Sequence, residues 1–255
     1  MDLYQFIQKN REVLLTILIA LFTLAASGFL LFHIAAEGIT IVIAVMIFNY
    51  SRKSIGTSGN SFVFLLGCAL AAVSIIDFLH VLTYYGMGVL IKDTANKATQ
   101  LWLAGRYILS LSLLFAPFCL TRKFLERNIY LAFTAITMAM VLIVFFYQGL
   151  PDCLTPARGL TTFKIYNEYI VIGILLMAFY HLRRNQSLVN RKSYLGILAA
   201  LAVFILTEIC FTLYINVYSI VGILGHMFKV FGYILFYYAI IVNDLNDLTR
   251  SNGRT

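Results

Sequence analysis

The sequence predicts an all-α integral membrane protein, a bundle of eight transmembrane helices with both termini in the cytoplasm. Three observations support this fold class. Hydrophobic residues make up 61% of the 255 residues and charged residues only 12%, whereas a soluble domain carries roughly 25% charged residues. The apolar residues occur in runs of the length that crosses a bilayer. Basic residues are concentrated in alternate connections between these runs, which is the pattern of the positive-inside rule.

The expected spans follow from the apolar runs in order along the chain. The eight segments are 13–33, 34–50, 61–84, 98–120, 129–147, 165–183, 193–215 and 222–242. The first segment lacks a small-residue cleavage site, so we expect a span and not a removable signal peptide. Residues 1–243 are expected to form a single transmembrane domain, and the polar residues 244–255 a flexible cytoplasmic tail.

The connections differ in charge and length. Those expected in the cytoplasm, 51–60, 121–128 and 184–192, are short and basic. The two longer ones, about 85–97 and 148–164, are expected on the outer side. The net charge of +8 then reflects a multi-pass topology in the cell inner membrane, with anionic lipid headgroups as the contacts and no nucleic acid.

Ionisable residues lie inside the apolar segments, nearly all towards the end that is predicted to face outwards. They are Glu37, Asp77, His80, Arg106, Glu168, Glu208, His226 and Lys229. A charge in the bilayer centre costs at least ~2.5–3.5 kcal/mol on insertion scales, so such residues usually serve a function. Their shared depth predicts one polar cavity in the outer half of the membrane, open to a small ligand.

Helical spacing places some of these residues on common faces. Asp77, His80 and Tyr84 form one stripe at i, i+3 and i+7, and His226 and Lys229 begin another. Tyr84 and Trp102 neighbour these stripes. These two aromatic side chains are expected either to form a wall of the cavity or to belong to the interfacial aromatic belt.

A purely structural interpretation of the charges is also open. Buried charges in a membrane pair with one another, and the sequence offers Asp77 with Arg106 and Glu208 with Lys229. The carboxylates nevertheless outnumber the cations within the spans. This surplus indicates protonation, water, a metal ion or a cationic ligand.

The histidines suggest a cofactor as an alternative. The candidate metal ligands are His33, Glu37, Asp77, His80 and His226. His80 and His226 could also be the axial ligands of a haem between facing helices. The same residues could equally be hydrogen-bonded partners in a polar network.

Motifs of hydrolytic or nucleotide chemistry are absent from the sequence. It contains no P-loop, GxSxG, HExxH or CxxC pattern, so we expect no catalytic residues and no enzyme. A membrane enzyme that uses an acid–histidine pair such as Asp77 and His80 is a weaker alternative, because nothing in the sequence indicates a substrate.

Five blocks in this sequence resemble the third type of bacterial and archaeal membrane-associated sensor domain. They are His33 with Glu37; Ile76–His80 through Tyr84–Gly88; Ala98–Trp102 with Arg106-Tyr107; Gly159–Thr161 through Phe163–Ile165 with Glu168-Tyr169; and Gly225–Lys229 leading to Tyr237. The resemblance implies a sensory input module ahead of a cytoplasmic histidine kinase, PAS or cyclic-di-nucleotide synthesis domain. The sequence ends at Thr255 without such a domain, so we expect the output to be fused in a longer protein or supplied in trans.

The combined expectation is a membrane sensor that binds a small polar ligand or ion from the extracytoplasmic side. Cationic parts of the ligand would contact Glu37, Asp77, Glu168 and Glu208; anionic parts would contact Arg106, Lys164 and Lys229; His80 and His226 would tune protonation or hold a metal. The last helix would carry the change to the output. A metal or haem redox protein and a small-solute transporter are the rivals, and the oligomeric state is open, a homodimer included.

Overall fold

The computed structural model describes residues 2–58, 61–89, 94–120, 124–147, 150–155, 159–186, 189–213 and 219–243. Helices α1 to α5 comprise Leu3–Lys9, Arg11–Ser27, Phe29–Ser58, Ser61–Thr83 and Thr94–Phe115, followed by the 3-10 helix η1, Ala116–Leu120. Helices α6 to α9 comprise Glu126–Phe146, Thr162–Arg184, Arg191–Leu213 and Ile220–Tyr237. The last helix continues into η3, a π-helical segment at Tyr238–Val242.

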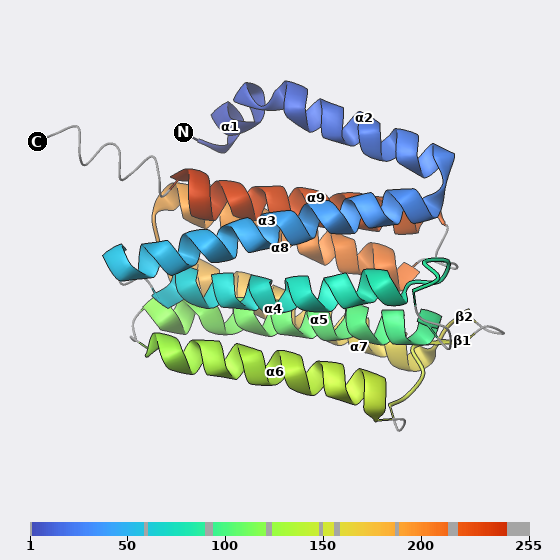
Figure 1. The fold of residues 1–255 in the computed structure, drawn as a ribbon. Helices are drawn as coiled ribbons and strands as arrows, with labels where there is room; N and C mark the ends of the chain where they lie inside the picture. The colour runs from blue at the N-terminus through green and yellow to red at the C-terminus, as the bar shows by residue number, and fades with distance from the viewer. Residues whose placement is uncertain are drawn as a thin grey trace, which may run out of the picture.

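The helices form one bundle in which neighbours lie side by side (Figure 1). Packing contacts connect α3 to α4, α4 to α5, α5 to α7, α7 to α8, α8 to α9, and α9 back to α3. These six helices therefore form a closed ring, which we call the six-helix ring. Helix α2 packs outside the ring against α3 and α9, and α6 packs outside it against α4 and α5.

A small antiparallel ribbon marks one end of the bundle. Strands β1, Leu154–Thr155, and β2, Gly159–Leu160, precede α7 and lie beside the start of α5. We call this the ribbon end, and Figure 1 shows it on the side opposite α1. The turn after α4 lies at the same end and contains Gly86 and Gly88, whose φ angles of 94° and 68° suit glycine.

The all-α membrane fold predicted from the sequence is confirmed. Seven of the described helices are long and apolar enough to cross a bilayer, and α1 with α2, which meet at a bend of 69°, supply up to an eighth span. The tail predicted at 244–255 lies outside the described residues.

The predicted boundary between the first two spans is wrong, and the error affects the site. We expected the first two spans to meet between residues 33 and 34, but α2 ends at Ser27 and α3 runs unbroken from Phe29. The four-residue spacing of His33 and Glu37 fits either a tight turn or a continuous helix. Both residues are buried inside the bundle, on one face of a continuous helix at i and i+4.

Helices α8 and α9 pack closely because glycines of α9 face aromatic rings of α8. A Cβ atom at Gly225 would lie 2.8 Å from Cζ of Phe211, and one at Gly232 would lie 2.5 Å from Cε1 of Phe204. Both distances are shorter than ordinary carbon contacts. This close approach brings His226 and Lys229, which lie between the two glycines in sequence, to the interior of the six-helix ring.

Candidate functional site

Every helix of the six-helix ring contributes an acidic or basic side chain to the interior. Glu37 comes from α3, Asp77 from α4, Arg106 from α5, Glu168 from α7, Glu208 from α8 and Lys229 from α9, and each is at most 1% exposed. Lys164 of α7 joins them, also 1% exposed. We call these seven residues the ionic network. The shared depth predicted from the sequence therefore corresponds to a real convergence of separate helices.

Lys229 lies at the centre of one half of this network. Its Nζ donates to Glu37 Oε2 at 2.6 Å and to Asp77 Oδ2 at 2.7 Å, joining α9 to both α3 and α4. Arg106 Nη2 lies 3.5 Å from both oxygens of Asp77, at the outer limit of hydrogen bonding. The ring of Trp102 lies within 4.7 Å of both cations, so cation–π attraction supports them further.

The other half of the network is centred on Glu168. Lys164 Nζ lies 2.6 Å from Glu168 Oε1 and also donates to the carbonyl oxygen of Phe211. The hydroxyl of Thr212 donates to Glu168 Oε2 at 3.1 Å. Glu208 interacts electrostatically with Arg106 and with Glu168, and its Oε2 has no hydrogen-bond partner among the described residues. Glu208 thus links the two halves through charge.

Lys164 belongs to the membrane-embedded site and not to a loop. We expected the sixth span to begin at residue 165, but α7 begins at Thr162, with the side chain of Thr161 capping the amide of Lys164. Lys164 therefore lies in the first helical turn, buried among the network residues.

One of the two ion pairs expected from the sequence is present. Asp77 pairs with Arg106 as expected. Lys229 pairs with Glu37 and Asp77, and no ion pair between Lys229 and Glu208 is found among the described residues. Four carboxylates share three cations, so the acid surplus expected from the sequence persists after the addition of Lys164, with Glu208 the least partnered member.

A layer of histidine and aromatic side chains lies next to the ionic network. It encloses a cavity of about 40 Å³, which we call the histidine pocket, lined by Phe29, His33, His80, Tyr84, Thr99, Trp102, Phe211, Gly222 and His226. His33 stacks on Tyr84 with ring centroids 4.0 Å apart, and its Nε2 lies 3.1 Å from Nε2 of His80. The volume suits a single water molecule or ion.

The predicted site residues therefore divide into two groups. His33, His80, Tyr84, Trp102 and His226 line the histidine pocket. The charged residues do not line it, because they are occupied with one another. The two groups touch where Trp102 lies against Arg106 and Lys229, and where Nδ1 of His226 lies 3.1 Å from Oε1 of Glu37.

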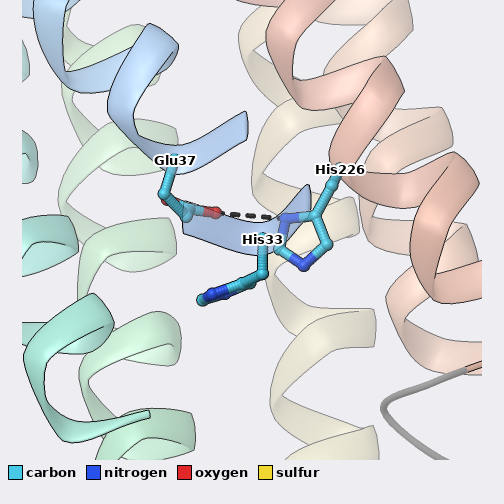
Figure 2. A group of neighbouring side chains, drawn as sticks. All are labelled: His33, Glu37 and His226. Carbon is cyan, nitrogen blue, oxygen red and sulfur yellow. Dashed lines mark ion pairs between the residues drawn. The ribbon is translucent and has the colours of Figure 1, made fainter. Parts of the chain in front are cut away.

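The metal-ligand candidates are reduced to a smaller set by the geometry. Ligand atoms of His33, Glu37 and His226 all lie within 4.8 Å of one another (Figure 2). Asp77 and His80 do not belong to this group. A haem between His80 and His226 does not fit this packing, since ligands of that size need roughly 300 Å³ or more, compared with the 40 Å³ found here.

Sequence reasoning missed Thr212 and four residues that line the histidine pocket, which are Phe29, Thr99, Phe211 and Gly222. Thr212 bonds Glu168 and lies one helical turn after Glu208, a spacing that could have identified it. Phe211 contributes its carbonyl oxygen to Lys164 and its ring to the histidine pocket. No sequence signal distinguishes this phenylalanine from the 20 others in the chain.

Cys153, in the connection before α7, is buried at the ribbon end. It is 1% exposed, and its amide donates to Oδ1 of Asn96, which fixes the ribbon to the start of α5. Burial raises the pKa of the Cys153 thiol to about 12, compared with about 8.5 in an unfolded chain. The folded protein therefore keeps this thiol protonated, and stability should fall as pH rises above about 8.5, where only the unfolded thiol ionises.

We expect Cys153 to resist alkylation in the folded protein. At pH 8 a water-soluble maleimide should leave Cys153 unmodified in folded protein over a period that fully modifies it in denatured protein, because the reactive thiolate does not form in the buried site. Mass spectrometry of proteolytic fragments measures this. Equally fast labelling in both states would show that the ribbon opens readily.

Comparison with known proteins gives one match. The chain matches the family model described as membrane-associated sensor domain, MASE3, over residues 9–247, which is nearly its whole length. No curated protein and no solved structure matches it. The matched range includes every residue of the ionic network and the histidine pocket.

Proposed function

The chain belongs to the MASE3 family of membrane-associated sensor domains, and from this premise we propose that it is a sensory input module for a small polar ligand or ion. The ligand reaches the ribbon end of the bundle and acts on the histidine pocket and the ionic network. The observation that carries this proposal is the convergence of ionisable side chains from all six ring helices on one level of a membrane bundle. Charges at such depth are expensive, and their concentration favours a functional site.

The ribbon end is proposed to face the outside of the cell inner membrane, with both termini in the cytoplasm. Arg52 and Lys53 lie in the last third of α3, Arg183 and Arg184 end α7, and Arg191 begins α8, all towards the end opposite the ribbon. Positive charge concentrates on the cytoplasmic side of membrane proteins, which supports this orientation.

The last helix is the proposed route to the output. α9 carries both His226, in the histidine pocket, and Lys229, in the ionic network, and it leads directly into the π-helical segment η3. π-helical turns often occur at functional positions in helices. A ligand would favour one packing of α9 over another only by the difference in its affinity for the two.

The partners follow from this route. We propose that residues 1–243 act as one non-catalytic input domain, and that the tail 244–255 leads to a histidine kinase of a two-component system or a cyclic-di-nucleotide synthase, fused or in trans. In the described membrane spans, every buried acidic, basic and histidine side chain lies in the half nearer the ribbon end. This distribution supports a receptor pocket over a continuous transport path.

The proposal is tested by connecting the chain, through its C-terminal end, to a cytoplasmic cyclic-di-nucleotide synthase and measuring product in cells. Trp102→Leu and His80→Gln change the histidine pocket and should shift output several-fold at equal protein level. His181→Gln is the matched control, because His181 lies towards the opposite end of α7, where its ring bonds to the carbonyl oxygen of Leu114 and packs against the ring of Phe118, away from the histidine pocket. If output follows protein level alone in all three variants, the sensor proposal is wrong.

A further inference from the structure

Three side chains of the types that bind metals meet beside the ionic network. His33 and Glu37 lie on one face of α3, and His226 reaches them from α9 (Figure 2). We propose that these three residues bind a divalent first-row transition-metal ion and that this ion is the species detected. The signalling role rests on the proposed function, but the binding itself does not.

The distances suit a single ion after a small adjustment. His226 Nδ1 and Glu37 Oε1 are already 3.1 Å apart, close to the separation of two ligands on a tetrahedral zinc. Two ligands of one zinc ion lie at most about 4.2 Å apart, twice the usual Zn–N distance. The ligand atoms here lie within 4.8 Å of one another, so side-chain movements of about half an ångström bring them into range.

Hydrogen bonding leaves a lone pair on His33. His80 Nδ1 lies 2.7 Å from the carbonyl oxygen of Ala98, which can only accept, so Nδ1 carries the proton and Nε2 of the neutral ring accepts. His33 Nε2 therefore donates to His80 Nε2. The remaining nitrogen of His33, Nδ1, is a buried acceptor without a hydrogen-bond partner among the described residues. His80 acts here as the outer partner that fixes the ring of a metal-binding histidine.

Glu37 can bind an ion without leaving Lys229. Its Oε2 accepts from Lys229 Nζ, while Oε1 faces His226 and has no other hydrogen-bond partner among the described residues. The network around it has four carboxylates and three cations. A bound dication adds positive charge to a network whose surplus carboxylate, Glu208, lies in the other half, whereas an additional anion would increase the acid surplus.

The donor set indicates the class of metal. Two imidazoles and one carboxylate suit zinc, copper, nickel, cobalt or ferrous iron, and they disfavour magnesium and calcium, which prefer oxygen ligands. Three protein ligands leave a fourth position, and the neighbouring histidine pocket of about 40 Å³ has space for one water there. An ion in this site would join α3 to α9, the helix that leads to η3.

The test measures binding of Zn²⁺ and Co²⁺ alone to the full chain in lipid nanodiscs, purified without a histidine tag. Metal content per chain is determined by mass spectrometry, and the visible spectrum of Co²⁺ reports its coordination. The parent and the His181→Gln control should bind one ion with the same affinity. His33→Gln and His226→Gln should each weaken the affinity for the metal about 100-fold. Loss of a residue that only hydrogen-bonds to a metal ligand typically weakens affinity by roughly 10- to 100-fold, and loss of the ligand itself should have at least the larger effect.

Glu37→Gln also removes a partner of Lys229 and can impair folding, so the two histidine variants decide the result. Absence of binding to the parent, less than tenfold weakening in both histidine variants, or equal weakening in His181→Gln would overturn the metal site. The output assay above is a separate measurement. Output that responds to the pocket variants without metal binding removes only the metal proposal. Metal binding with unresponsive output removes the sensor proposal and the signalling role of the ion, but not the binding site.

Discussion

Lys229→Met should lower the stability of the folded protein by about 3–5 kcal/mol, the effect of removing one partner from a buried ion pair. The ammonium group is the closest cation to both Glu37 and Asp77, at 2.6 and 2.7 Å. Methionine is similar in length but neutral, so the variant keeps the packing and removes the charge. Two buried carboxylates would then share only Arg106, which lies 3.5 Å from Asp77.

Thermal unfolding in one detergent, followed by circular dichroism, gives the comparison. Lys53→Met, on the exposed opposite end of α3, is the matched control and should change stability by less than about 0.5 kcal/mol. The double variant Lys229→Met with Glu37→Gln should recover part of the loss, because it removes one of the unpaired carboxylates. If Lys229→Met is as stable as Lys53→Met, the ionic network does not hold the six-helix ring together.

Sequence reasoning located the level of the site but not its internal arrangement. Apolar runs and helix direction predicted a common depth for Glu37, Asp77, Glu208 and Lys229. The depth of a residue in the membrane depends only on its position along its own span. Which residues pair depends on which helices are neighbours. The closed ring brings α9 against α3, so Lys229 reaches Glu37 and not Glu208.

The separation into an ionic network and a histidine pocket was also beyond sequence reasoning. The network residues and the pocket residues lie at a similar depth in the membrane. Helical periodicity shows which residues share a face of a helix, but it does not show which neighbouring helix that face contacts. The error at the start of α3 has a related cause. Polar residues in an apolar run leave the position of a helix end open, because partners from distant helices can satisfy them inside the bundle, as Lys229 does for Glu37.

Removal of a carboxylate charge should destabilise the protein to a different extent in the two halves of the network. Asp77 lies between two cations, since Lys229 and Arg106 both bond to it. Glu208 has an oxygen without a hydrogen-bond partner among the described residues and belongs to the half with excess acid. The same chemical change, acid to amide, should therefore have opposite consequences at the two positions.

Asp77→Asn should cost about 3 kcal/mol or more, because it leaves Lys229 and Arg106 with one fewer carboxylate in a medium that does not solvate them. Glu208→Gln should cost less than about 1 kcal/mol or stabilise the protein, since neutralising a surplus buried charge removes a desolvation penalty. Both variants conserve volume, so thermal unfolding in the same detergent isolates the charge. Equal losses at the two positions would mean that Glu208 is compensated as fully as Asp77. The acid surplus, and with it the electrostatic reason for a cationic ligand, would then not exist.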